Sequence, residues 1–144
     1  MIQNILVAID GSDLSEQVIA TLHQIKLSSD TKIILSYVIP NTGADVDVAA
    51  DRPQADQEDV AYIHMKKLME PLQAEFYCPS ELEIVTGDPA EEIIRLANIY
   101  KADLIVIGSR GLTGINRILL GSVSSQVVAD AHCSVLVVKP KSNH

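Results

Sequence analysis

The stretch that decides the fold is Asp103-Leu-Ile-Val-Ile107 followed by Gly108-Ser-Arg-Gly-Leu-Thr-Gly-Ile-Asn-Arg-Ile-Leu-Leu-Gly-Ser-Val-Ser-Ser125. Its short apolar run is typical of a strand covered on both faces, as in a parallel sheet. A glycine-rich segment comes directly after this strand, and Gly121-Ser122 begins a segment with helical spacing. A strand, a glycine loop and a helix in this order lie where open α/β sheets bind their ligands.

Four other apolar runs, rich in Val and Ile, predict further buried strands. They are Ile5 to Ile9, Lys32 to Ile39, Glu81 to Val85 and Val135 to Val138, and the decisive stretch adds Leu104 to Ile107. Apolar residues at helical spacing fill the gaps, over Leu14 to Ile25, Ala61 to Phe76, Ile93 to Tyr100 and Val123 to Ala131. Alternating strands and helices need right-handed crossovers, so we expect a three-layer α/β/α sandwich with a five-stranded parallel sheet.

Two segments interrupt this pattern. Pro71 falls inside the second helical segment, where it predicts a kink or a division into two shorter helices. The stretch from Asn41 to Gln57 shows neither period and carries several Asp among small residues, which predicts a mobile loop. A lid over a ligand is the alternative for this loop.

Composition excludes several classes of function. The 144 residues fit one domain, 1–144, and a net charge of −8 opposes nucleic acid and anionic membrane surfaces as partners. No apolar run approaches the ~18 residues of a membrane span, and the N-terminus lacks the features of a signal peptide, so we expect a cytoplasmic protein. Cys78 and Cys133 have no metal-ligand spacing and are expected to be free thiols. The histidines form no metal motif: His23, His64, His132 and His144.

The glycine-rich segment has the chemistry of an anion site. Glycine lets a phosphate approach the backbone, and the unpaired N–H groups that begin a helix attract negative charge. Ser122 and Ser124 add hydroxyl donors, and Arg110 adds a positive charge. Neither a P-loop nor a dinucleotide-binding glycine motif is present, and turn-forming glycines with Ser122 as a helix cap are the structural alternative.

These residues resemble the universal stress protein family, whose ATP-binding members carry G-x2-G-x9-G-[ST]. Gly108, Gly111, Gly121 and Ser122 match that motif throughout. The resemblance extends to Ile5-Leu-Val-Ala-Ile-Asp-Gly-Ser12, Gly87-Asp-Pro89 and Val135-Leu-Val-Val138, and so covers nearly the whole chain. One position departs, since Ser134 stands where members of the family often have Pro.

The resemblance implies a strand order of 3-2-1-4-5, the adenine nucleotide alpha hydrolase-like fold, and a homodimer. It also implies ATP or another adenine nucleotide with a divalent metal, Mg²⁺, as the ligand. Asp10 would contact the nucleotide, Ala8 and Ile9 would line the base, and Val38 would offer backbone hydrogen bonds to adenine. The remaining residues that the resemblance assigns surround the ribose and phosphates: Ile107, Gly108, Arg110, Gly111, Gly121, Ser122, Val123 and Ser124.

With this strand order the apolar strand Val135 to Val138 lies at an edge of the sheet. An exposed apolar edge is able to pair with a second copy across a two-fold axis, which favours a homodimer. Lys139, Pro140 and Lys141 offer the alternative of a monomer whose edge is protected by charge and by proline.

The sequence thus favours a regulatory or stress-response protein that binds an adenine nucleotide. Slow ATP hydrolysis or phosphoryl transfer in the same pocket is the alternative, with Asp10 as its one candidate for positioning a water. A flavin carrier is disfavoured because no aromatic residue is placed to sandwich the flavin ring. A protein-interaction module with an empty glycine loop also stays open.

Overall fold

The structure is a computed structural model that describes residues 2–10, 13–40, 54–109 and 121–139. Strands and helices alternate along these residues. The strands are β1 (Asn4–Ile9), β2 (Lys32–Pro40), β3 (Ser80–Gly87), β4 (Leu104–Gly108) and β5 (Ser134–Val138). The helices are α1 (Asp13–Gln24), α2 (Gln54–Gln73), α3 (Pro89–Ile99) and α4 (Ser122–Asp130).

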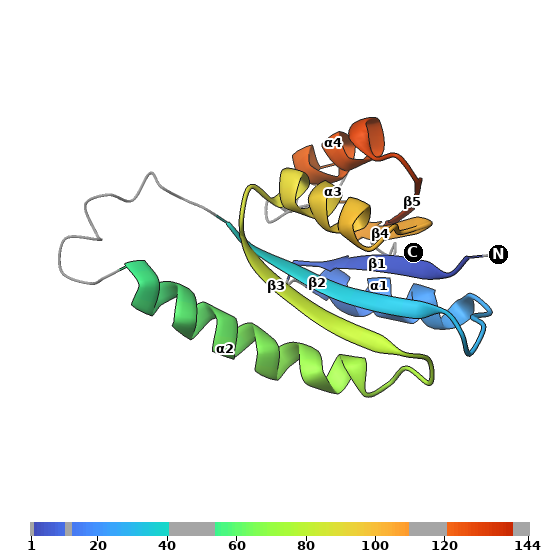
Figure 1. The fold of residues 1–144 in the computed structure, drawn as a ribbon, viewed down its shortest axis with the longest axis horizontal. Coiled ribbons are helices and arrows are strands. Elements are labelled where there is room, and N and C mark those ends of the chain that lie inside the picture. Colours follow the sequence, from blue (N-terminus) through green and yellow to red (C-terminus); the bar gives the residue numbers. More distant parts are fainter. Residues whose placement is uncertain (1, 11–12, 41–53, 110–120, 140–144) are drawn as a thin grey trace, which may run out of the picture.

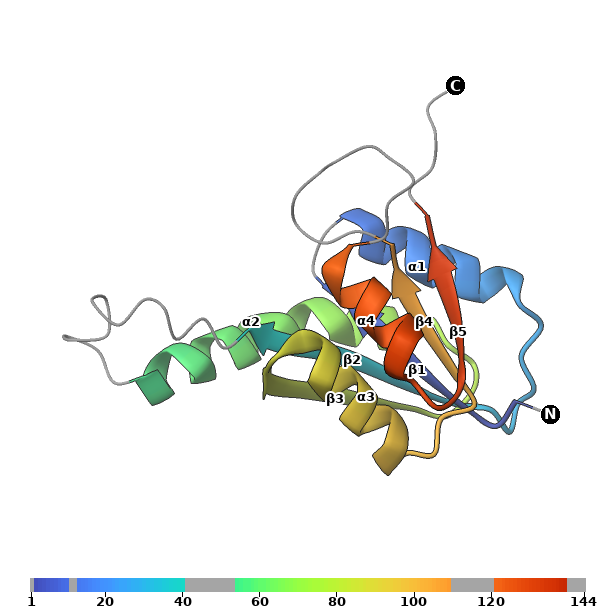
Figure 2. The same ribbon diagram turned by 90° about the horizontal axis from the view of Figure 1, so that it is seen from above.

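The strands form one parallel sheet in the order β3-β2-β1-β4-β5, which confirms the expected fold. Helices α1 and α2 cover one face of this sheet, and α3 and α4 cover the other (Figure 1). The view turned by 90° shows α3 and α4 lying together over the sheet (Figure 2). The result is the three-layer sandwich that the alternating pattern predicts.

Alternation within the strands divides the core into two halves, because neighbouring side chains point to opposite faces. In β1, Ile5 and Val7 pack with α1 and α2, whereas Leu6 packs with α3 and α4. All three side chains are fully buried. Burial on both faces explains why the central strands have no polar alternation.

Two predictions about α2 need correction. The helix begins at Gln54, so residues 54–57 are helical although the sequence predicts a loop there. Its first two turns are polar and had no apolar period to mark them. Pro71 lies inside α2, which is one helix that ends at Gln73. The predicted division into two shorter helices is therefore wrong, and the predicted kink stays a prediction.

The rest of the predicted loop, residues 41–53, lies outside the described residues, and so does the lid hypothesis. Strand β5 begins at Ser134, so the strand includes the position where members of the family often have Pro. No helix within the described ranges is long and apolar enough to cross a membrane.

The topology separates the two chain segments that leave the carboxyl ends of the central strands β1 and β4. Strands β1 and β4 are neighbours, but the helices that follow them cover opposite faces: α1 packs through Val18 and Leu22, and α4 packs through Val127. The chain therefore diverges at the carboxyl ends of β1 and β4. A crevice at this point is the usual ligand site of an open α/β sheet.

Candidate functional site

A cavity of about 300 Å³ lies at the carboxyl ends of β1, β2 and β4. Its volume is at the lower end of the roughly 300–1,000 Å³ typical of small-molecule sites. Strand ends supply most of its lining, and α1, α3 and α4 close it. The lining residues are Ala8, Ile9, Asp10, Ser15, Val18, Ser36, Tyr37, Val38, Pro40, Pro89, Ile93, Ile107, Gly108, Gly121, Ser122, Val123 and Ser124.

The cavity brings together every candidate residue from the sequence that the structure describes. Ala8, Ile9 and Asp10 come from β1 and its end, Val38 from β2, and Ile107 and Gly108 from β4. Residues 121–124 come from the start of α4. Arg110 and Gly111 lie outside the described residues.

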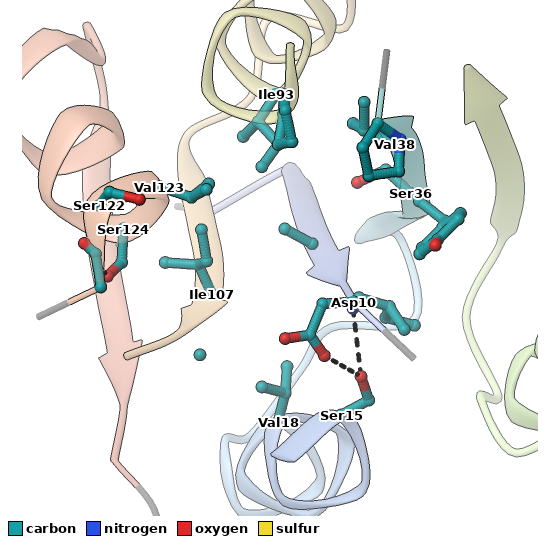
Figure 3. Close-up of a pocket in the computed structure, with 17 residues that line it drawn as sticks. Asp10, Ser15, Val18, Ser36, Val38, Ile93, Ile107, Ser122, Val123 and Ser124 are labelled. Carbon is teal, nitrogen blue, oxygen red and sulfur yellow. Dashed lines mark hydrogen bonds between the residues drawn. The ribbon is translucent and has the colours of Figure 1, made fainter. Parts of the chain in front are cut away.

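One wall of the cavity is apolar and comes from four different elements. Val38, Ile93 and Ile107 are each less than a tenth exposed, and Ala8 is half-buried. Figure 3 shows Val38 and Ile107 on opposite sides of the cavity, with Ile93 of α3 above them. These four side chains form an apolar slot. The slot suits a flat apolar group, because removing apolar surface from water lowers the free energy.

Strand β2 runs past the end of β1 at this wall. The pairing of β1 with β2 ends at Ile9 with Tyr37, whereas β2 stays paired with β3 as far as Pro40 with Gly87. Among the residues that the structure describes, no strand therefore lies beside the β1-facing edge of β2 from Val38 onward. Backbone N–H and C=O groups on such an edge are suited to hydrogen-bond a planar heterocycle.

The carboxylate of Asp10 is oriented by Ser15, the third residue of α1. The Ser15 hydroxyl donates to Asp10 Oδ1 at 3.1 Å, and the Asp10 N–H donates to Ser15 Oγ at 3.2 Å (Figure 3). Ser15 is buried while Asp10 is exposed. Burial raises the pKa of the nearby Tyr37 phenol, and the negative charge of Asp10 raises that pKa further. This side of the cavity is thus negative and rich in acceptors.

The opposite side of the cavity is the start of α4. Gly121 is the N-cap, with φ −65° and ψ 164°, and no side chain among the described residues caps this helix. No acidic residue lies in its first turn. The N–H of Ser125 already donates to Gly121 O at 2.9 Å, so the donors aimed at the cavity are those of residues 122–124. These N–H groups make the α4 end positive.

Ser124 has a role that the sequence did not predict. Its side chain is buried, and its hydroxyl lies 3.0 Å from Ser109 O and 3.1 Å from Gly121 O, both acceptors. The Ser109 N–H in turn donates to Val138 O at 2.9 Å. These bonds tie the start of α4 to the ends of β4 and β5. The hydroxyl of Ser124 therefore holds the loop ends together, while Ser122 is exposed.

Helix α3 also begins at this cavity, but its start is closed. Asp88 is its N-cap and accepts from the Glu91 N–H at 3.1 Å, and Pro89 at its first position has no N–H. Glu91 and Glu92 place negative charge in its first turn. Of the starts of α3 and α4, that of α4 is the one left open to an anion.

No cluster of three or more His, Cys, Asp or Glu that would hold a metal ion occurs within the residues described. Asp10 is the one carboxylate among the described lining residues. A divalent cation here would depend on a carboxylate and on oxygens of the bound molecule, a common arrangement for Mg²⁺.

Several lining residues were not found from the sequence. Tyr37 neighbours Val38 in β2 and places an aromatic ring at the cavity that the sequence analysis did not place there. Ser15 and Val18 follow Asp10 on α1 at helical spacing, a signal that was available. Pro89 and Ile93 line the cavity because α3 packs over the sheet, and no local sequence pattern predicts that packing. The full set is Ser15, Val18, Ser36, Tyr37, Pro40, Pro89 and Ile93.

Comparison with known proteins gives one consistent match. Residues 1–139 match the sequence model of the universal stress protein family. Universal stress protein MJ0531 of Methanocaldococcus jannaschii is 35% identical over 142 residues, which cover 95% of this chain and 82% of that protein.

Solved structures agree with this match. The structure of hypothetical protein MJ0577, also from Methanocaldococcus jannaschii, superimposes with a TM-score of 0.81 at 29% identity and covers 99% of both chains. A universal stress protein in complex with cAMP superimposes with a TM-score of 0.66 at 28% identity. That match covers 96% of this chain and 97% of the other.

Proposed function

The chain belongs to the universal stress protein family, and from this premise we propose that it is a stress-response protein that binds an adenine nucleotide, ATP with Mg²⁺, in the cavity at the ends of β1, β2 and β4. The observation that carries the proposal is the pairing, in one cavity, of an apolar slot with the open start of α4. A nucleotide has the same two parts, a flat base and a phosphate chain.

The slot suits the base. Ala8, Val38, Ile93 and Ile107 offer apolar contact, and the β1-facing edge of β2 offers backbone hydrogen bonds. The structurally similar universal stress protein in complex with cAMP supports adenine as the base, because cAMP carries it. The overall fold that the two chains share, with a TM-score of 0.66 at 28% identity, supports a base site at the same strand ends.

The start of α4 suits the phosphates. The main-chain N–H groups of Ser122, Val123 and Ser124 would donate to phosphate oxygens, and Gly121 and Gly108 would let the phosphate chain approach the backbone. Arg110 and Gly111 are proposed to contact the same phosphates on the grounds of the family motif. Bound Mg²⁺ would neutralise phosphate charge.

We propose nucleotide binding, and not catalysis, as the function of this site. Phosphoryl transfer needs a group that positions the attacking nucleophile and others that neutralise developing charge. Among the described lining residues, Asp10 is the one carboxylate that would position an attacking nucleophile. Its carboxylate already accepts a hydrogen bond from Ser15.

Native mass spectrometry of the purified protein, followed by calorimetry with MgATP, tests the proposal. We expect a co-purifying adenine nucleotide or saturable heat with MgATP, and weaker binding of MgGTP. Ala8→Val, which narrows the slot, should lower affinity at least about tenfold, whereas Ala20→Val on the exposed side of α1 should not. Absence of any nucleotide and of any heat would refute the proposal.

We also propose a homodimer that forms through β5. Val135, Leu136 and Val137 are half-buried on this edge strand, whereas the opposite edge strand, β3, carries Glu81 and Glu83. Charges on an edge oppose pairing with another strand, so β5 is the better candidate.

We also propose that the protein is located in the cytoplasm. Cys78 and Cys133 are both free thiols, which supports a reducing compartment.

A further inference from the structure

Helix α2 carries an exposed apolar stripe on the side that faces away from the sheet. Val60, Ile63 and Lys67 recur at the spacing i, i+3 and i+7, which places them on one side of the helix. Val60 is 67% exposed and Ile63 is 53% exposed, whereas Met65 and Met69 are buried in the core on the other side. We call Val60, Ile63 and the aliphatic stem of Lys67 the outer stripe.

The outer stripe lies apart from the cavity and from β5. Helix α2 packs against β2 and β3, at the end of the sheet opposite β5, and none of the described lining residues of the cavity comes from α2. Its first turns extend past the carboxyl ends of β2 and β3 (Figures 1 and 2). Leu68, beside the stripe, is also 50% exposed. Exposed apolar residues that adjoin one another, unlike scattered single ones, mark a contact surface.

Two exposed charges flank the outer stripe on the same side. Asp59 and Lys66 are two turns of helix apart, so their side chains project from the same flank. Their Cα atoms are separated by about 10 Å along the helix axis, and Val60 and Ile63 lie between them. None of the ion pairs among the described residues involves Asp59 or Lys66. The stripe therefore has a negative end and a positive end.

This arrangement of charge and apolar surface is complementary to itself. A two-fold axis that makes two helices antiparallel brings like flanks together. Val60 of each copy then packs on Ile63 of the other, and Asp59 of each copy faces Lys66 of the other. Two equal ion pairs thus close the apolar centre. A parallel pair brings unlike flanks together and separates Asp59 from Lys66 of the other copy.

We propose that the outer stripe binds the same stripe of a second copy of this chain, with the two α2 helices antiparallel. The contact lies outside the cavity and outside the proposed β5 interface, so it would join dimers to one another. A patch of a few residues buries less than the roughly 1,200 Å² of stable specific interfaces, and exposed ion pairs add little. The association is therefore weak and depends on protein concentration.

Disulfide trapping tests a weak contact, because it captures two copies when they meet. Val60→Cys and Ile63→Cys are made in separate full-length chains, one of them tagged, and the mixed chains are oxidised mildly. Residues that pack directly across an interface come within the distance that a disulfide spans. We expect the disulfide between positions 60 and 63 to form at least about threefold faster than either disulfide between identical positions.

Two controls set the background rate of this reaction. Ile99→Cys replaces an isoleucine of α3 that is 58% exposed, close to the exposure of Ile63, and should react with itself about tenfold more slowly than the mixed pair. The wild type gives the contribution of the native thiols Cys78 and Cys133.

Charge variants test the orientation of the two helices. Lys66→Glu in both cysteine chains should slow the mixed disulfide at least about threefold, because it turns two attractions into repulsions. Adding Asp59→Lys to Lys66→Glu should restore the rate, because the two ends of the stripe are complementary again. Lys26→Glu, the same change at an exposed lysine outside α2, should leave the rate unchanged.

The outcomes decide the inference without any nucleotide, so its failure would leave the proposed function standing. A mixed disulfide no faster than the Ile99→Cys control would overturn the inference and leave the stripe to a different partner. Faster pairing of identical positions would indicate parallel helices and would overturn it too. A rate that Lys66→Glu does not change, or that the charge exchange does not restore, would contradict the proposed ion pairs and with them the antiparallel contact.

Discussion

Gly121 affects both the stability of α4 and the proposed binding of phosphate at the start of that helix. Its φ of −65° is open to any residue, so backbone geometry does not require glycine there. A residue without a side chain does, however, leave the first N–H groups of α4 uncapped. Helix starts favour Ser, Thr, Asp or Asn at this position, and this chain forgoes that stabilisation where the phosphates are proposed to bind.

Gly121→Asp should therefore separate stability from binding. The carboxylate would cap α4 and complement its dipole, and should raise the free energy of unfolding by a few tenths of a kcal/mol up to about 1 kcal/mol. It should weaken MgATP more than about tenfold, because it occupies the N–H groups and repels phosphate. Urea denaturation and calorimetry measure the two effects. A variant that is more stable and binds MgATP as tightly as the wild type would contradict this account of α4.

At position 87, in contrast, the backbone conformation does require glycine. Its φ is +156°, and a Cβ atom there would lie 2.8 Å from Glu92 Cγ. Gly87→Ala should cost about 1–2 kcal/mol of unfolding free energy, measured by urea denaturation. In the background Glu92→Ala the contact disappears but the backbone strain does not, so most of the cost should persist. Loss of the whole effect in that background would assign it to the contact instead.

At the scale of elements, Asp103 fastens β1 to the start of β4. Its carboxylate accepts from the N–H groups of Gln3 and Asn4 at 2.8 and 3.0 Å. These bonds, with that of Asn4 the larger effect, lower the pKa of Asp103. A lowered pKa in the folded state means that the stabilisation is complete above the carboxyl's unfolded pKa, and is lost as the pH falls through its folded pKa.

Asp103→Asn should accordingly lower the unfolding free energy at pH 7 by about 1 kcal/mol, a modest figure because the carboxylate is exposed. The gap to the wild type should shrink as the pH falls below about 4. Thermal unfolding followed from pH 7 to pH 3 measures it, with Asp59→Asn on the exposed surface of α2 as the control. A gap that stays constant with pH would show that the carboxylate charge is not the cause.

The elements also show how far sequence reasoning extends. The five strands could be predicted because each is buried on both faces and so forms an unbroken apolar run, as in Ile5 to Ile9. The start of α2 could not, because the sequence of residues 54–59, Gln-Ala-Asp-Gln-Glu-Asp, has no apolar period. Edge strand β3 is longer than the predicted Glu81 to Val85, since its ends pair through backbone groups that side-chain pattern does not report.

The candidate site divides in the same way. Residues on strand ends and at the start of α4, such as Asp10 and Gly121, could be found because chain order places them at the carboxyl edge of a parallel sheet. Tyr37 could have been found by its place in the chain, since it directly precedes Val38 near the carboxyl end of β2. Ile93 could not, because only the packing of α3 over β2 brings it to the cavity.

At the scale of the whole molecule, the two edges of the sheet differ, and the difference predicts the assembly. We expect a dimer in light scattering behind size exclusion. Leu136→Lys in β5 should convert it to a monomer, because the charge opposes pairing at the apolar edge. Leu82→Lys in β3 is the matched control, since both leucines are half-buried against the same half of the core. A wild-type monomer, or a dimer lost only in Leu82→Lys, would contradict the proposed interface.

The open start of α4 and the closed start of α3 face one cavity, and this contrast makes the central claim measurable in a single experiment. Backbone amide signals of isotope-labelled protein are followed by NMR during titration with MgATP. The account predicts large, saturating shifts of the Ser122, Val123 and Ser124 amides, and small shifts at Glu91 and Glu92, where Asp88 already accepts a hydrogen bond. Unchanged α4 amides at saturating MgATP, or shifts concentrated at α3, would contradict it.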